Sequence, residues 1–217
     1  MQAYIFDLDD TLYNLSHHRA RHLRRAWQVW LDTLPAATVA QILERAVLER
    51  IFFRDMDQFL LEAGASDASL RQELIAVSQQ TWFMDLRLDE GVAAVLSALA
   101  QTHQLGLLTN GPSWTQRAKI EQLQLAQWFP TMIVSGEYGH DKPDARIFEE
   151  MLRQLDVRAE DAVMVGDNPD VDIRGAHGVG MRAVWVQQPH LPYPADMALP
   201  WRTISHVRDL QMAVRSS

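Results

Sequence analysis

The stretch Y-I-F-D-L-D-D-T-L-Y, residues 4–13, decides how the rest of the chain is interpreted. Its first three residues are apolar and favour a buried strand, and the strand is followed by Asp7, Asp9 and Asp10. Carboxylates this close together repel one another, and removing them from water is costly without a counter-ion. They follow the carboxyl end of the strand, where open α/β sheets bind ligands, and therefore predict a site for a divalent cation. The alternative from this stretch alone is a strand followed by an acidic turn.

The overall composition is typical of a globular protein that binds neither nucleic acids nor membranes. The chain has 217 residues, of which 47% are hydrophobic and 22% are charged, and this suits one domain with a smaller insertion. The net charge of −8 argues against binding to a nucleic acid polymer. The chain has no cysteine, which excludes disulfides, thiolate catalysis and zinc–cysteine sites. No apolar run approaches the roughly 20 residues that span a bilayer, and no secretion signal opens the sequence. We therefore expect a cytoplasmic protein.

Two different patterns divide the chain after its first strand. Residues 14–84 carry apolar side chains spaced three and four apart, without a strand pattern, and are predicted to be all-helical. Residues 85–217 alternate between strand and helix patterns, which predicts a parallel sheet with right-handed crossovers. We therefore expect an α/β core formed by residues 1–13 and 85–217, with a helical domain inserted at 14–84.

The later strands of the core are predicted from short apolar runs between helical patterns. We expect strands at residues 105–108, 132–135, 162–165 and 183–186, and helices at 89–102, 113–123, 143–155 and 171–177. Residues 187–203 contain four prolines and are predicted to be an irregular surface segment. A short strand from Ile204 and a helix from Val207 to Val214 complete the prediction.

Within the helical segment, the spacing of side chains separates buried from exposed positions. Trp27 and Trp30 have the spacing of residues that face a helical core. His17, His18 and His22 lie near the start of the first predicted helix and are expected to be solvated. No residue of this segment identifies a substrate.

The second strand of the core is followed by Thr109, Asn110 and Gly111. A hydroxyl and an amide at the end of a strand can bind a phosphoryl oxygen, together with backbone N–H groups of a glycine turn. The same three residues also suit an ordinary turn with no ligand.

The chain has only two lysines, Lys119 and Lys142, so the position of each is informative. Pro143 suits the first position of a helix, which would put Lys142 at the helix N-terminus. A cation there opposes the helix dipole, and this placement predicts a neighbouring acidic cluster or a bound anion. The alternative is a solvated lysine in a loop.

A second group of acidic residues follows the fourth strand of the core. Gly166 and Asp167 follow this strand directly, and Asp172 lies five residues beyond Asp167. If the first and fourth strands are neighbours, then Asp7, Asp9 and Asp167 converge. Hard oxygen ligands in this number favour Mg²⁺.

Taken together, these segments resemble the haloacid dehalogenase superfamily of Mg²⁺-dependent phosphohydrolases. The matching motifs, in chain order, are F-D-L-D-D-T-L at residues 6–12, L-T-N-G at 108–111, K-P at 142–143, and G-D at 166–167 followed by Asp172. The resemblance implies a Rossmann-like parallel sheet with strand order 3-2-1-4-5 and an inserted all-helical cap. The form D-D-T-L-Y of the first motif is similar to the pyrimidine 5′-nucleotidase branch and to sugar-phosphate phosphatases.

The resemblance also implies the role of each catalytic residue. Asp7 would be the nucleophile that forms an aspartyl-phosphate, and Asp9 would be the general acid and base. Thr109 and the backbone of Asn110 would bind the phosphoryl group. Lys142 would neutralise developing charge and hold Asp7 in position.

The metal site that the resemblance implies uses three aspartates of the two acidic segments. Mg²⁺ would be bound by the carboxylates of Asp7 and Asp167 and by the backbone carbonyl of Asp9. Asp172 would orient Lys142 or a water molecule on the metal.

The superfamily includes more than one reaction, and Asp9 distinguishes between two of them. Its dehalogenases lack an acid at this position because displacing a halide requires no proton donor, so Asp9 favours phosphoryl transfer.

We expect a phosphatase that acts on a small phosphorylated metabolite, either a nucleoside monophosphate or a sugar phosphate. A phosphomutase of the same fold is the first alternative. A non-enzymatic phospho-acceptor module also uses acids, Mg²⁺, threonine and lysine, but such modules are shorter and lack a helical insertion. The sequence predicts no oligomeric state.

Overall fold

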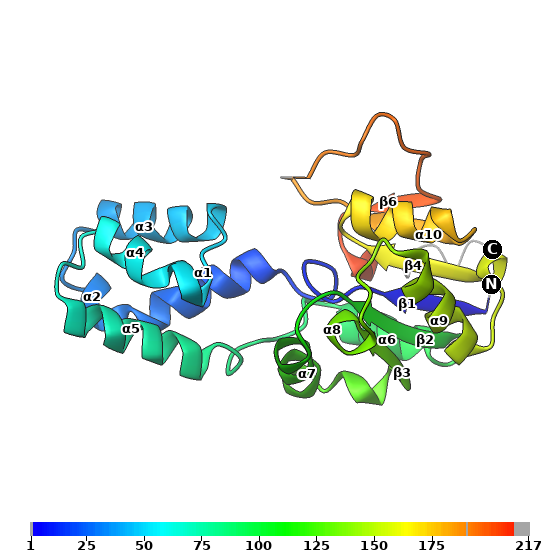
Figure 1. Ribbon diagram of the computed structural model, residues 1–217, viewed down its shortest axis with the longest axis horizontal. Helices are drawn as coiled ribbons and strands as arrows, with labels where there is room; N and C mark the ends of the chain where they lie inside the picture. The colour runs from blue at the N-terminus through cyan, green and yellow to red at the C-terminus, as the bar shows by residue number, and fades with distance from the viewer. Residues whose placement is uncertain (1, 190, 211–217) are drawn as a thin grey trace. The chain divides into compact units, whose positions relative to one another are not determined.

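The computed structural model describes residues 2–189 and 191–210, which form two compact units (Figure 1). One unit comprises Met1–Asn14 and Arg87–Ser217, and the other comprises Leu15–Leu86. These boundaries lie one or two residues beyond those expected from the sequence. The first unit is an α/β structure and the second is all-helical. Among the described residues, no helix is both long and apolar enough to cross a bilayer.

The α/β unit contains a six-stranded sheet in the order β3-β2-β1-β4-β5-β6, in which every neighbouring pair is parallel. The strands are β1 (Ala3–Phe6), β2 (Gln104–Thr109), β3 (Thr131–Val134), β4 (Ala162–Gly166), β5 (Arg182–Val186) and β6 (Arg202–Ile204). The predicted Rossmann-like order 3-2-1-4-5 is confirmed, and β6 extends the sheet by one strand. The predicted last strand ends at Ile204 instead of beginning there.

Short helices connect the strands. They are α6 (Val92–Leu99), α7 (Ser113–Gln122), α8 (Ser135–Tyr138), α9 (Ala145–Leu155) and α10 (Arg174–Gly178), together with the 3-10 helices η2 (Leu125–Gln127) and η3 (Ala159–Asp161) and the π-helical η4 (Pro169–Ile173). A last 3-10 helix, η5 (Val207–Leu210), follows β6. The predicted terminal helix corresponds to η5 over its first four residues, and its remainder lies outside the described residues.

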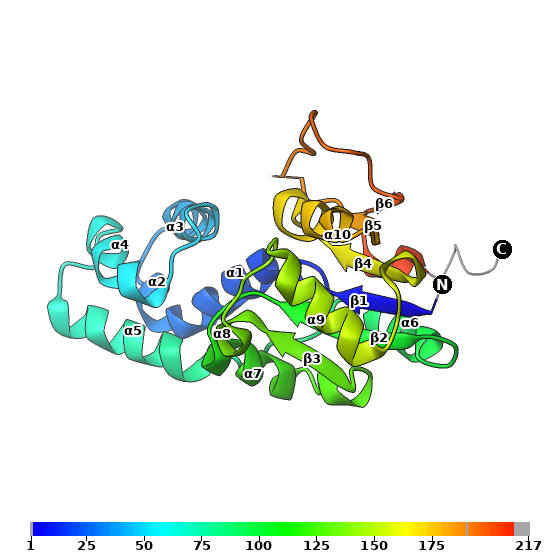
Figure 2. The same ribbon diagram turned by 45° about the vertical axis from the view of Figure 1, so that its right-hand side comes forward.

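The first strand lies at the centre of the sheet. All four residues of β1 are buried, as expected for a parallel strand that is covered on both faces. Ile5 is paired with Gly106 of β2 on one side and with Met164 of β4 on the other. A Cβ atom at Gly106 would lie 2.7 Å from the sulfur of Met151, so this glycine lets α9 pack closely on the sheet. Figures 1 and 2 show α9 and α10 beside each other on the same face.

This topology determines where the acidic residues emerge. Phe6, the last residue of β1, is in register with Leu107 of β2 and Val165 of β4. The residues that follow these strands therefore share one edge of the sheet. This edge lies at the point where the strand order reverses, which is the usual ligand site of open α/β sheets.

The helical unit has its own apolar core. Its helices are α1 (Leu15–Ala26), α2 (Gln28–Leu31), α3 (Ala36–Leu48), α4 (Met56–Glu62) and α5 (Ala68–Thr81), with a short turn η1 (Phe53–Asp55). Trp27 and Trp30 are buried, which confirms their predicted place in this core. The indole N–H of Trp27 donates a hydrogen bond to the hydroxyl of Ser78, 3.0 Å away.

Two histidines of α1 are also buried, so the prediction that they are solvated is wrong for them. His18 and His22 are each 1% exposed, whereas His17 is exposed as predicted. The Nε2 atoms of His18 and His22 lie 2.8 Å from the Trp82 carbonyl and 3.1 Å from the Ser78 carbonyl. Helix α1 therefore packs this side against α5, and the two carbonyls contact the Nε2 atoms of the buried rings.

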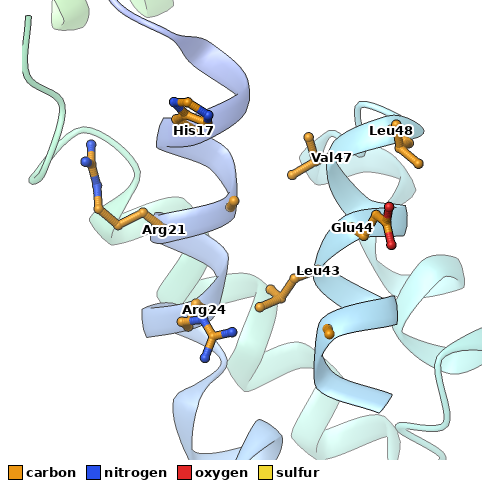
Figure 3. Close-up of a pocket in the computed structure, with 9 residues that line it drawn as sticks. His17, Arg21, Arg24, Leu43, Glu44, Val47 and Leu48 are labelled. Carbon is orange, nitrogen blue, oxygen red and sulfur yellow. The ribbon is translucent and has the colours of Figure 1, made fainter. Parts of the chain in front are cut away.

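A groove of about 560 Å³ runs between α1 and α3 on the surface of the helical unit (Figure 3). Leu43 and Val47 point from α3 toward α1 and line the groove, while Arg21 and Arg24 project from α1.

We expect Gly175→Ala to destabilise the α/β unit by about 1–3 kcal/mol, the usual cost of overpacking a core. A Cβ atom at Gly175 would lie 2.3 Å from the ring of Phe148, which is fully buried, and 3.2 Å from the Cα atom of Pro143. Chemical denaturation followed by circular dichroism measures this loss. The matched control is Gly178→Ala in the same helix, because a Cβ atom there meets nothing within 4 Å. Equal stabilities of the two variants would contradict the packing that we describe.

We expect the helical unit to lose stability as the pH falls from about 6.5 toward 4. Burial lowers the pKa of His22 from 6.5 to about 4, although the hydrogen bond to Ser78 opposes this change. Below pH 6.5 the unfolded chain therefore takes up a proton that the folded protein does not, and its effect is on the order of 2 kcal/mol at pH 4.5. Unfolding free energies of the full chain at pH 7 and pH 4.5 test this. His22→Gln keeps an N–H donor but does not titrate, so it should lose less stability than the wild type over this interval. The same loss in both proteins would contradict the prediction.

Candidate active site

Asp7 and Lys142 form the centre of the candidate site. The backbone N–H of Asp7 continues the pairing of β1 with β4 by donating to the Val165 carbonyl, 2.9 Å away. The Lys142 Nζ atom lies 2.7 Å from Asp7 Oδ1 and 2.6 Å from Asp172 Oδ1. Lys142 is 3% exposed and Asp172 is 1% exposed. Buried charges persist only when they are paired, and here one ammonium group contacts two carboxylates.

The backbone of Lys142 is held by the side chain of Asn110. The Asn110 amide donates to the Lys142 carbonyl at 2.9 Å, and its oxygen accepts from the Lys142 N–H at 2.8 Å. Pro143 is not the first residue of a helix, contrary to the prediction, because α9 begins at Ala145 with Asp144 as its cap. The Lys142–Pro143 peptide bond is cis. The position of Lys142 therefore follows from its hydrogen bonds with Asn110 and from its ion pairs with Asp7 and Asp172. The helix dipole does not explain it, because Lys142 is not at the N-terminus of α9.

Three aspartates converge on the lysine from two segments of the chain. One carboxylate oxygen from each of Asp7, Asp167 and Asp172 lies within 4.8 Å of the others. Asp172 also accepts a hydrogen bond from the Asn168 N–H at 3.0 Å. A Cβ atom at position 166 would lie 2.4 Å from the Asp172 carboxyl group, so only Gly166 permits this approach. Within 2–189 and 191–210, no group donates a hydrogen bond to the Asp167 carboxylate.

The electrostatics of this cluster favour the binding of an additional cation. Burial raises the pKa of Asp7 to about 7, although the charge of Lys142 opposes the change. Burial and the charge of Asp7 raise the pKa of Asp167 to about 9. Burial opposes the charged form of Lys142 as well, but Asp172 and Asp7 raise its pKa well above the ordinary value. One ammonium group therefore does not compensate three carboxylates. A set of hard oxygen donors that lacks positive charge fits a divalent metal ion.

Asp9 belongs to a second polar cluster, in which two of its partners come from helix α7 and the third is Tyr13. The Lys119 Nζ atom lies 2.8 Å and 2.7 Å from the two carboxylate oxygens of Asp9. Gln116 donates to the same carboxylate at 3.2 Å, and the Tyr13 hydroxyl donates to it as well. Burial raises the pKa of Asp9, but the charge and hydrogen bonds of Lys119 outweigh it, so the pKa lies below its ordinary value.

Thr109 and Asn110 lie beside this second cluster. The Gln116 Nε2 atom is 2.5 Å from the Thr109 hydroxyl and 3.0 Å from the Asn110 carbonyl. The Gly111 N–H donates to the Ser135 hydroxyl at 2.9 Å. The expectation that the glycine turn offers its N–H groups to a phosphoryl oxygen is therefore wrong for Gly111, because Ser135 already occupies that group.

The structure places Asp7, Lys142, Asp167 and Asp172 in one cluster, whereas the carboxylate of Asp9 lies in the other cluster, beside Thr109. Three further residues contact these clusters. Lys119 and Gln116 were not predicted as site residues, although the scarcity of lysine marked Lys119 as unusual. Gln188 also contributes, because its amide donates to the Asp10 carbonyl at 2.6 Å. Gln188 lies in the segment expected to be irregular surface, and no local sequence pattern indicates this contact.

Comparison with known proteins identifies the family of the chain. A profile of haloacid dehalogenase-like hydrolases matches residues 4–186. N-acylneuraminate-9-phosphatase of Rattus norvegicus is 33% identical over 156 residues, which cover 71% of this chain and 63% of that protein. The aligned part thus spans less than two thirds of that relative's length. Glyceraldehyde 3-phosphate phosphatase of Methanopyrus kandleri is 31% identical over 205 residues, which cover 87% of this chain and 84% of that protein.

A solved structure supports the same assignment. The crystal structure of 2-haloacid dehalogenase from Pseudomonas syringae pv. Tomato DC3000 aligns with a TM-score of 0.63 and 29% identity over 99% of this chain and 98% of that one. The family profile covers most of the α/β sheet and the whole helical unit. The chain therefore belongs to the haloacid dehalogenase-like hydrolase family.

Proposed function

We propose that this protein is an Mg²⁺-dependent phosphatase that hydrolyses a small phosphorylated metabolite, either a nucleoside monophosphate or a sugar phosphate. The observation that carries the proposal is the contact between Asp7 and Lys142, within a cluster of three carboxylates that one ammonium group does not neutralise. Membership of a hydrolase family supports it, and two of the similar proteins are named phosphatases.

In this proposal Asp7 is the nucleophile. Lys142 contacts Oδ1 of its carboxylate, and within the described residues no donor contacts the other oxygen, which therefore remains available to attack phosphorus. The new bond joins Asp7 to phosphorus while the ester P–O bond breaks. The protonated form of Asp9, which is the minor form in the free protein because Lys119 lowers its pKa, gives its proton to the leaving oxygen. Water then attacks phosphorus, Asp9 accepts a proton from it, and inorganic phosphate leaves Asp7.

The metal ion would be bound by the carboxylates of Asp7 and Asp167 and by the backbone carbonyl of Asp9. When bound, Mg²⁺ supplies positive charge that attracts phosphoryl oxygens. Asp172 orients Lys142, because it accepts a hydrogen bond from Nζ at 2.6 Å. Asp167 meets no donor among the described side chains and is therefore the most available ligand.

The phosphoryl group would contact Thr109, Lys142 and the backbone N–H of Asn110. Gln116 donates to the Thr109 hydroxyl oxygen, which leaves the hydroxyl hydrogen able to donate to a phosphoryl oxygen. The Asn110 side chain is occupied by Lys142, so Asn110 contributes through its backbone alone.

Haloacid dehalogenation is the competing reaction, because a similar solved structure is named a 2-haloacid dehalogenase. Halide leaves as an anion and needs no proton donor. The Asp9 carboxylate is held by Tyr13, Gln116 and Lys119. This arrangement favours the phosphatase, because in that reaction Asp9 transfers protons.

We expect phosphate release from a panel of nucleoside monophosphates and sugar phosphates to require Mg²⁺ and to stop with a chelator. Asp7→Asn should abolish turnover because the nucleophile is lost. Asp9→Asn should reduce turnover by about 10²–10⁴-fold, the usual contribution of general acid–base catalysis. Asp170→Asn is the matched control, since Asp170 is an exposed carboxylate that pairs with Arg174.

Undiminished phosphate release by Asp7→Asn would exclude Asp7 as the nucleophile. Isomerised product after addition of a bisphosphate would favour the phosphomutase, and halide release from a 2-haloacid would favour the dehalogenase.

We expect Mg²⁺ to stabilise the metal-free protein more at pH 8 than at pH 5.5. The pKa values of Asp7 and Asp167 are raised from 3.8 to about 7 and about 9, so ionising these carboxyls in the folded protein costs stability. Their stabilising protonated form is fully effective below about pH 3.8, and its contribution is lost as the pH rises from there to about 7 and about 9. Mg²⁺ binds the ionised carboxylates and should restore about 2.7 kcal/mol at 100 times its Kd. Thermal unfolding with and without Mg²⁺ measures this. Asp167→Asn should remove the effect and Asp170→Asn should keep it. A pH-independent gain that survives in Asp167→Asn would place the metal elsewhere.

A further inference from the structure

We propose that Lys119 is a positioning residue for Asp9: its ammonium group holds the Asp9 carboxylate where it exchanges protons with the leaving oxygen and with water. The proposal rests on the proposed function, in which Asp9 is the general acid and base. It assigns a task to the second of the two lysines in the chain.

The geometry of the pair fits positioning better than direct binding of a substrate. Lys119 Nζ is within 2.8 Å of both carboxylate oxygens of Asp9, so a single cation fixes the orientation of the carboxyl plane. The Lys119 side chain is 7% exposed, whereas that of Asp9 is 27% exposed. A small substrate therefore reaches the carboxylate more readily than the ammonium group behind it.

Helix α7 presents a second group on the same face. Gln116 and Lys119 are three residues apart and are therefore neighbours on the helix surface. The Gln116 amide contacts Asp9 Oδ2, the Thr109 hydroxyl and the Asn110 carbonyl. It thereby links the proposed acid to the residues that would bind the phosphoryl group. One face of α7 thus sets the position of Asp9 relative to the end of β2.

The alternative is that Lys119 only stabilises the packing of α7 on the sheet. Breaking a buried ion pair destabilises a protein in either case, so stability alone does not separate the two roles. The distinguishing property is that a positioning residue acts through Asp9. Its removal should lower kcat with little change in KM, and should have little further effect when Asp9 itself is absent.

The test compares Lys119→Met with Arg117→Met in the full-length protein with Mg²⁺. Arg117 lies on the same helix and pairs with Glu137 at the surface, so its loss removes one cation without touching Asp9. For the best alkyl phosphate of the panel, we expect kcat of Lys119→Met to fall by about 10–100-fold, a part of what general acid–base catalysis contributes, with KM within about threefold. Arg117→Met should stay within about twofold of the wild type. Lys119→Arg, which keeps the cation, should recover part of the loss.

The double variant Asp9→Asn/Lys119→Met completes the test. Its activity is measured with 2,4-dinitrophenyl phosphate, whose leaving group departs without a proton, so that the Asp9→Asn background remains measurable. When Asp9 is already replaced by Asn, we expect the further change Lys119→Met to lower kcat by less than about threefold. Thermal unfolding of each variant identifies any that are not folded, and Lys119→Gln replaces Lys119→Met if that variant is not.

Three results would overturn the proposal. They are an unchanged kcat in folded Lys119→Met, a loss that appears in KM, and a loss of the same size with and without Asp9. A wild-type protein that releases phosphate from no substrate would instead overturn the proposed function, and the role of Lys119 with it.

Discussion

The concentration of negative charge at the end of β1 is the constraint on which the site depends. Asp7, Asp167 and Asp172 place carboxylate oxygens within 4.8 Å of one another, and the cost of doing so is high in a buried environment. Several local features make this possible. The parallel pairing of β1 with β4 brings Asp7 beside Asp167, Gly166 leaves room for Asp172, and Lys142 supplies the first positive charge. A divalent metal ion would supply the rest.

The two lysines of the chain divide between the two carboxylates that matter for the proposed chemistry. Lys142 contacts Asp7, and Lys119 contacts Asp9. Buried ion pairs contribute little to net stability because each charge must be removed from water. Their presence is better explained by orientation, since a carboxylate that attacks phosphorus and one that transfers a proton must each be held in a particular direction. The two pairs come from different elements, so the two carboxylates are held independently.

The helical unit, Leu15–Leu86, is a compact body with its own apolar core. Beside this core, the Nε2 atoms of His18 and His22 contact backbone carbonyls of the same unit. Its surface groove between α1 and α3 combines apolar side chains with two arginines (Figure 3). The chemistry of the site and the surface features of the helical unit are thus encoded in separate segments of the sequence.

The sequence by itself determined the alternation of strands and helices, the strand order through its resemblance to a family, and the core positions of Trp27 and Trp30. These three features follow from local spacing and from short motifs, each of which can be recognised within one segment of the chain. Only the tertiary structure decided that Lys119 and Gln116 face Asp9, because α7 carries polar residues around its circumference and its pattern does not reveal how it is rotated. The same holds for the buried histidines and for the start of α9 at Ala145. Each depends on which neighbour a side chain meets across the fold, and a local pattern carries no information about a partner more than 100 residues away, as Asp9 is from Lys119.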